Sequence, residues 1–272
     1  MTGSPSTTGE VMPGGGRRLR WALRALAAFV VLMLVLLAGP IAVLASGDVD
    51  LGPGWRAASR GSSGQAPDPA HESNAVVQVY GARTVRWRGA FGIHSWIAVK
   101  RAGASEYTTY QVIGWRAYRG LSAVDVRPGA VPDGHWFGQP PLLLADRRGA
   151  GVEELIDRIE DAVASYPYAD TYRSYPGPNS NTFIAHIGRE VPALQLDMPA
   201  NAIGKDWRPL DHPVGRAVSG TGWQASLYGL LGVTVGIEEG LEFNLLGLSF
   251  GIDLNRPAWR LSEQFDDGVD LA

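Results

Sequence analysis

Residues 175–187 read YPGPNSNTFIAHI, and this stretch decides how the second half of the chain folds. Its Pro-Gly-Pro turn leads into Asn179, a residue type whose side-chain oxygen caps the free N–H groups of a helix start. Phe183 and Ile187 follow at helical spacing, so we expect a helix that begins at Ser180. The unpaired N–H groups of a helix start favour negative charge. The Ser180 hydroxyl is therefore a candidate nucleophile.

Upstream, the chain predicts β-strands that place two polar side chains on one face. A turn centred on Gly103 and Ala104 would pair the strands on either side of it as an antiparallel hairpin. His94 then lies opposite Ile113, and Gln111 falls on the same face as His94 because side chains repeat every two residues. The expected strands, rich in β-branched and aromatic residues, are AVVQVY at 75–80, IHSWIAVK at 93–100 and YTTYQVI at 107–113.

The rest of the domain is expected to combine a loop, a helix and a hairpin. Residues 119–138 contain two prolines and four glycines, which is typical of a loop. Apolar residues recur every three or four positions over 149–165, which predicts an amphipathic helix. Residues 230–237 and 243–252 alternate, which predicts a buried β-hairpin, with a membrane-dipping segment as the alternative. The charged residues of this half are expected in solvated turns: Lys205, Asp206, Glu238, Glu239 and Glu242.

The N-terminal sequence predicts a segment that targets the chain to a membrane. Four arginines precede an uncharged apolar run that is long enough to cross a bilayer once. The basic flank predicts a cytoplasmic N-terminus and an extracytoplasmic domain, while a signal peptide cleaved near Ala45 is the rival interpretation. The expected organisation is a cytoplasmic basic tail (1–24), a transmembrane anchor in the cytoplasmic membrane (25–45), a flexible linker (46–74), a globular domain (75–257) and an acidic tail (258–272).

The composition excludes several classes of protein. The 272 residues include no cysteine, so disulfides, thiolate metal sites and a thiol nucleophile are ruled out. The formal net charge is only −3, and nucleic acid is not an expected partner. Five dispersed histidines form no metal-binding pair, so we expect no catalytic metal and no cofactor. The expected partners are the lipid bilayer and a cell-envelope substrate of unknown identity.

Two resemblances follow from these segments. The domain resembles an uncharacterised bacterial family, domain of unknown function 3750, through RGAFGIHSWIAVK, YPYADTYRSYPGPNSNTFIAHI, NAIGKDW, SGTGWQASLYGLLGVTVGIEEGLE and NLLGLSFGID. That family supplies no activity. A histidine at the head of a strand, followed later by NSNTF at a helix start, also resembles the circularly permuted papain-like proteins, which include lecithin:retinol acyltransferase-like and NlpC-type groups. This second resemblance implies an α+β fold with cysteine at position 180, where this chain has Ser180.

The papain-like resemblance implies a Ser-His hydrolase or acyltransferase. The membrane anchor and the outward-facing domain indicate cell-envelope substrates, with lipid acyl or peptidoglycan amide bonds. Ser180 would attack the carbonyl, His94 would remove its proton, and Gln111 would orient the imidazole. N–H groups around Ser180 and Asn181, beside Asn179, would hold the oxyanion. A serine needs active proton removal because its pKa lies far above that of a thiol. The alternative is a non-catalytic, membrane-tethered binding or structural module of the same fold.

Overall fold

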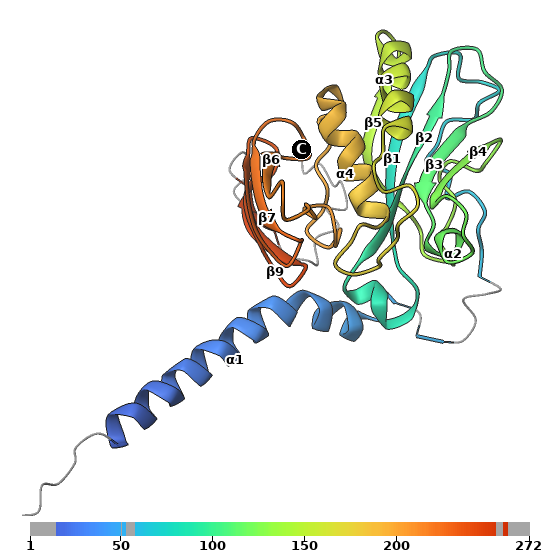
Figure 1. Cartoon of the computed structure of the whole chain (residues 1–272). Coiled ribbons are helices and arrows are strands. Elements are labelled where there is room, and N and C mark those ends of the chain that lie inside the picture. Colours follow the sequence, from blue (N-terminus) through green and yellow to red (C-terminus); the bar gives the residue numbers. More distant parts are fainter. Residues whose placement is uncertain (1–14, 50, 53–57, 254–257, 261–272) are drawn as a thin grey trace, which may run out of the picture. The chain divides into compact units, whose positions relative to one another are not determined.

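The computed structural model describes residues 15–49, 51–52, 58–253 and 258–260, and the chain forms two units (Figure 1). The first unit, Met1–Ala38, contributes most of helix α1 (Gly15–Ser46), which continues through Pro40 into the second unit, Gly39–Ala272. A stretch of 31 residues in α1, with a mean hydropathy of 2.8 over its most apolar window, has the length and composition to cross a membrane. The expectation of one long apolar helix near the N-terminus is confirmed.

The second unit is an α+β domain that contains two antiparallel sheets, which confirms the α+β part of the fold-class prediction. The first sheet has the order β4-β3-β2-β1-β5. The β2–β3 pair places Ile97 opposite Tyr110, which is the predicted register, and continuing that register puts His94 opposite Ile113. The strands are β1 (Val76–Arg83), β2 (Ile93–Lys100), β3 (Thr108–Val112), β4 (Val124–Pro128) and β5 (Leu142–Arg148).

Helices α3 and α4 cover one face of the first sheet, and α4 lies between the two sheets (Figure 1). Their apolar sides pack on the inward side chains of β1, β2 and β3 and form the main core of the domain. Both helices appear where the apolar spacing predicts them, and α4 begins at Ser180 as expected. The helical segments are η2 (Arg86–Ala90), α2 (Gly114–Ala117), α3 (Val152–Ala164), α4 (Ser180–Glu190) and η3 (Pro192–Leu194).

The second sheet has the order β11-β10-β9-β8-β7-β6. Its polar face is turned toward the interior of the domain. The strand expected at 230–237 is β8, but the run expected as its hairpin partner at 243–252 turns at residues 246–247 and is shared by β9 and β10. The prediction that the apolar side chains of these strands are buried is also wrong. Trp223, Val235 and Phe243 are 64%, 51% and 43% exposed. The polar residues that alternate with them along the strands are buried, among them Gln224, Thr234 and Glu242. The strands are β6 (Val214–Arg216), β7 (Trp223–Leu227), β8 (Leu231–Gly236), β9 (Gly240–Leu245), β10 (Leu248–Asp253) and β11 (Ala258–Arg260).

Buried charges explain why the polar side of this sheet turns inward. Lys205 is 5% exposed and donates to the Glu242 carboxylate at 2.8 Å, so the expectation of solvated turns for these residues is wrong. Arg189 on α4 donates to the Lys205 carbonyl and to Gln224 of β7. Burial, followed by the nearby Glu242 carboxylate, raises the pKa of Asp206 to about 6. Polar side chains on the inner face of the sheet are needed because buried charges must be hydrogen-bonded.

Three further segments differ from the sequence-based expectation. The predicted loop over 119–138 contains strand β4, because its Val-Asp-Val-Arg-Pro run pairs with β3. Residues 58–74 of the predicted linker run along the domain, where the Asp133 carboxylate accepts hydrogen bonds from Ser62 and Ser63. Strand β11 lies beyond the predicted end of the domain at 257, and residues 261–272 of the predicted acidic tail lie outside the described part of the chain.

The buried pair predicts a large and specific stability effect. Lys205→Met should lower the free energy of unfolding by about 3–5 kcal/mol, because it leaves the Glu242 carboxylate buried without its cation. Adding Glu242→Gln to this variant should recover part of the loss. Urea unfolding of the full chain in detergent micelles measures both effects. Arg148→Met, which breaks the more exposed pair with Asp146, is the control and should cost less than about 1 kcal/mol. Equal losses for Lys205→Met and Arg148→Met would contradict the assignment.

Candidate active site

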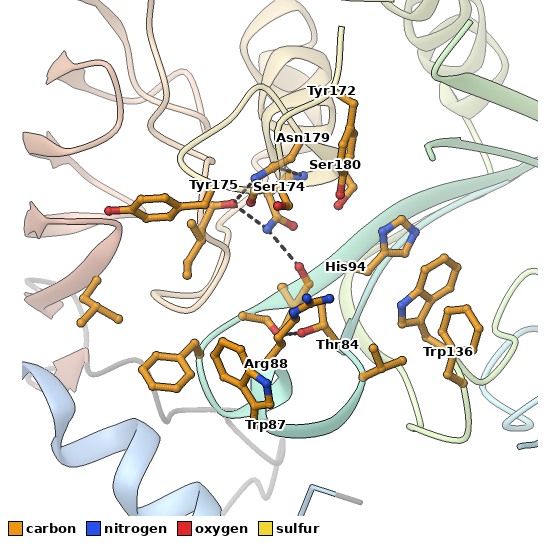
Figure 2. Close-up of a pocket in the computed structure, with 18 of the residues that line it drawn as sticks. Thr84, Trp87, Arg88, His94, Trp136, Tyr172, Ser174, Tyr175, Asn179 and Ser180 are labelled. Atoms are coloured by element: carbon orange, nitrogen blue, oxygen red, sulfur yellow. Dashed lines mark hydrogen bonds between the residues drawn. The ribbon is translucent and has the colours of Figure 1, made fainter. Parts of the chain in front are cut away.

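A pocket of about 580 Å³ lies in the second unit, where the start of α4, the start of β2 and η2 come together (Figure 2). Ser180 and His94 both line it. Apolar groups dominate its walls, and Arg88 is the one charged residue among the described residues that line it. The aromatic residues in the walls are Trp87, Phe91, Trp115, Trp136, Phe137, Tyr172 and Tyr175.

Ser180 is held in place by its two asparagine neighbours. Asn179 caps α4: its side-chain oxygen accepts from the N–H groups of Asn181 and Thr182, and the Thr182 hydroxyl accepts from the Asn179 N–H. The Asn181 side chain donates to the carbonyls of Ile93 and Ile203. Both asparagines are therefore structural supports of Ser180. The Ser180 hydroxyl itself has no hydrogen-bond partner among the residues that the structure describes.

The expected oxyanion donors are only partly available. The Asn181 N–H, which sequence reasoning assigns to an oxyanion, donates to Asn179 Oδ1 at 2.9 Å instead. The side-chain amide groups of Asn179 and Asn181 are likewise occupied by backbone carbonyls. The Ser180 N–H remains, at the first position of an 11-residue helix, where N–H groups lack intrahelical partners.

His94 and Gln111 lie on one face of the first sheet, as the predicted register requires. His94 Nε2 and Gln111 Oε1 are 3.0 Å apart, and Gln111 Nε2 donates to Asp125 at 3.3 Å. Asp125 on β4 is 3% exposed and forms ion pairs with Arg116 and Arg127. Gln111 thus connects the imidazole to a buried carboxylate.

This chain of contacts fixes which nitrogen of His94 carries the proton. An ionised carboxylate only accepts hydrogen bonds, so the Gln111 amide must turn its N–H toward Asp125 and its oxygen toward His94. The imidazole then donates from Nε2. Nδ1 is left with a lone pair, and it has no partner among the described residues.

Aromatic rings hold the imidazole in place. The Trp136 ring stacks on His94 with 3.7 Å between centroids, and Figure 2 shows the imidazole between Trp136 and the start of α4. Burial lowers the pKa of His94 to about 4, and the contact with Gln111 opposes this shift only in part. His94 is therefore neutral at pH 7 and keeps a lone pair on Nδ1, but a pKa this low makes the imidazole a weaker base than an ordinary histidine.

The structure brings Ser180 and His94 to one pocket without bonding them to each other. The Ser95 hydroxyl faces α4 and donates to the Asn181 side chain and, at 3.4 Å, to the Ser180 carbonyl, so its neighbour His94 points to the opposite face of the sheet. Both nevertheless line the pocket because His94 lies at the start of strand β2, next to the loop that precedes it. No hydrogen bond joins the two side chains within the described part of the chain.

Other residues considered from the sequence lie away from this centre. The Tyr110 hydroxyl donates to Glu160 on α3, which places it on the core side of the sheet. His186 packs against Tyr166 and contacts the Ala162 carbonyl, as expected for a packing residue. Among the described residues no cluster of three or more His, Cys, Asp or Glu side chains is arranged to hold a metal ion.

Sequence reasoning missed Asp125 and Trp136. Asp125 lies in the segment predicted as a loop, and its signal was an acidic residue between two valines in a short β-type run. Trp136 follows His135 in the same predicted loop, and only the folded structure brings it onto His94. His135 itself contacts the Gly61 carbonyl and does not line this pocket.

The buried imidazole predicts a specific acid sensitivity. The unfolded chain binds a proton on His94 below its ordinary pKa of 6.5, whereas the folded chain does so only near 4, so stability falls as the pH drops through this window. At about 1.4 kcal/mol per pKa unit, the full loss is on the order of 3 kcal/mol. Urea unfolding between pH 7 and pH 4 should show a shallower fall for His94→Gln than for the wild type. His212→Gln, at an exposed site, should match the wild type; an unchanged pH dependence in His94→Gln would contradict the assignment.

Comparison with known proteins gives one match. No curated protein and no solved structure matches the chain. The one match is to a family model and covers residues 74–207. This segment includes the whole first sheet, α3, α4 and the residues Ser180, His94, Gln111 and Asp125. Residues 74–207 of the chain match the family model described as protein of unknown function (DUF3750).

Proposed function

We propose that the second unit is a membrane-tethered acyl hydrolase or acyltransferase of the DUF3750 family, in which the aromatic pocket binds an acyl chain and Ser180 reacts with the acyl carbonyl. One observation carries the proposal: a largely apolar pocket of about 580 Å³ has in its wall a neutral, oriented imidazole and a serine hydroxyl that has no partner among the described residues. Pockets of this size and polarity are typical of small-molecule sites. In this proposal α1 anchors the chain, and the domain lies outside the cytoplasm.

The lining favours a lipid acyl group over a peptidoglycan amide. A peptide substrate needs several polar partners for its backbone, whereas the walls here are mainly aromatic and aliphatic side chains. Arg88 stands at the same pocket next to Trp87, where its guanidinium would bind a phosphate or carboxylate. A lipid with an anionic head group fits both features.

The chemistry would proceed by acyl transfer through Ser180. The Ser180 oxygen attacks the carbonyl carbon while His94 Nδ1 takes its proton, and the Ser180 N–H stabilises the oxyanion. The tetrahedral intermediate then expels the alcohol or amine, which receives the proton from His94, and leaves an acyl-serine. Water or a second alcohol attacks this ester and passes its proton to His94. The bond to Ser180 then breaks, the acyl group leaves as a carboxylic acid or a new ester, and His94 returns the proton to the Ser180 oxygen. Gln111 and Asp125 act as positioning residues, because they hold the imidazole with Nε2 protonated.

A non-catalytic acyl-binding module is the second candidate. Two observations favour it: Ser180 and His94 form no hydrogen bond in the described structure, and the Asn181 N–H is already used by Asn179. Catalytic hydrogen bonds often tighten only when substrate binds, so the first observation is compatible with both functions. The two candidates share the pocket and differ in whether Ser180 forms a covalent bond.

A fluorophosphonate probe separates these candidates. We expect the full chain in detergent micelles to be labelled, because the probe traps a nucleophilic serine, and Ser180→Ala to lose the label. Ser174→Ala is the matched control, since Ser174 lines the same pocket and is exposed. Its labelling should equal that of the wild type. Absence of labelling in the wild type, or equal labelling of Ser180→Ala, would leave only the binding module.

A cysteine at position 180 tests the environment of the hydroxyl directly. Because the chain contains no cysteine, Ser180→Cys carries a single thiol whose alkylation by iodoacetamide reports its pKa. We expect this pKa to lie below the ordinary value of about 8.5, because the thiolate would face the N-terminus of α4. Ser174→Cys provides the reference profile of alkylation rate against pH. Identical profiles for the two thiols would contradict an activating site at position 180.

A further inference from the structure

The outer face of the second sheet is an uninterrupted apolar surface. Trp223, Val235, Leu241 and Ile252 lie opposite one another and form a row across β7, β8, β9 and β10. Two further rows follow at two-residue steps along the strands. The second row consists of Ala225, Val233, Phe243 and Phe250, and the third consists of Leu227, Leu231, Leu245 and Leu248. These three rows, which we call the outer apolar face, contain no charged and no hydrogen-bonding group except the indole N–H of Trp223.

This polarity is the reverse of that of an ordinary water-facing sheet. A sheet with one solvated face normally presents polar side chains to water and apolar ones to the core. Here Glu242 and Asn244 of β9 are buried, while Phe243 between them is 43% exposed. A continuous exposed apolar patch marks a surface that contacts another apolar phase or molecule.

The outer apolar face reaches the candidate active site. Leu248 belongs to the third row of this face and also lines the pocket. Leu246, in the turn just before β10, lines the pocket as well. On another side of the pocket, η2 contributes Trp87 and Arg88. Ala90 at the end of η2 belongs to one buried apolar cluster with Val49 and with Val43, which lies in the last turns of the apolar helix α1. The pocket is therefore bordered by an apolar face and by the segment on which the membrane-length helix ends.

We propose that the outer apolar face docks on the lipid bilayer that holds α1, so that the pocket opens toward the membrane surface. The bilayer is favoured over a second copy of the chain for two reasons. Helix α1, which would enter the bilayer, ends near η2, and the outer apolar face leads into a pocket large enough for an acyl chain. Trp223, 64% exposed in the first row next to Arg216 of β6, is the residue type that gathers at membrane–water interfaces. This inference rests on the proposed membrane anchoring, and it does not require Ser180 to be reactive.

Spin labels at single cysteines test the docking. The chain has no native cysteine, so Val235→Cys on the outer apolar face and Val126→Cys on β4 each carry one label. The two valines are matched, being 51% and 48% exposed on strands of different sheets. The full-length variants are reconstituted into vesicles of phosphatidylcholine and phosphatidylglycerol. Collisions of each label with oxygen, which concentrates in lipid, and with a water-soluble nickel chelate are then measured by electron paramagnetic resonance.

Three outcomes are distinguishable. Docking on lipid predicts several-fold more oxygen collisions and several-fold fewer nickel collisions for the label at 235 than for the label at 126. Frequent collisions with both reagents at 235 would show a water-exposed face and overturn the proposal. Protection from both reagents would show that protein covers the face, either a second copy, which dipolar broadening of the spectrum would reveal, or another segment of the chain; this would overturn the proposal as well. The fluorophosphonate result is independent of all three, so the two hypotheses can fail separately.

Discussion

The start of α4 is fastened by two asparagine side chains, and the geometry of the domain depends on this attachment. The Asn179 amide donates to the carbonyls of Ser174 and Ile203, and the Asn181 amide donates to those of Ile93 and Ile203. Each bond contributes only about 1 kcal/mol net, but leaving such a buried group unpaired costs about 1–3 kcal/mol. An exchange of either amide for an apolar side chain would thus release several segments at once. These hydrogen bonds bring together the start of α4, the start of strand β2 and the turn that contains Ile203.

That attachment also accounts for the inverted second sheet. Because the Ile203 carbonyl is held at α4, the residues that follow it, Lys205 and Asp206, are carried into the interior. The buried Lys205 ammonium requires a polar partner, and the sheet supplies one from the inward position of Glu242, while Gln224 of β7 donates to the Asp206 carbonyl. In a strand, successive side chains alternate between faces, so an inward polar set leaves the apolar set outside. The outer apolar face is then tolerated only where something other than water meets it.

The sequence predicts the parts of this domain that are determined by neighbouring residues. The capping of α4 by Asn179 and the pairing of His94 with Gln111 follow from a cap signal and from a turn at Gly103, both local features. The direction in which the second sheet faces could not be read in this way, because strand alternation defines two faces without saying which meets the core. Sequence reasoning assigned the apolar side to the core by the usual rule. The deciding groups, Lys205 and Asp206, are distant in sequence from the strands that bind them.

The same division applies to the candidate active site. Asp125 and Trp136 come from a segment whose glycines and prolines suggest a loop, and their relation to His94 exists only after β4 pairs with β3. Once formed, these contacts restrict the imidazole from two sides, since Gln111 fixes its tautomer and Trp136 covers its ring. Under the proposed mechanism, His94 is therefore the fixed partner. Ser180 is the adjustable one, because rotation about a single side-chain bond redirects its hydroxyl, and an acyl chain in the pocket would hold the carbonyl where that hydroxyl can reach it.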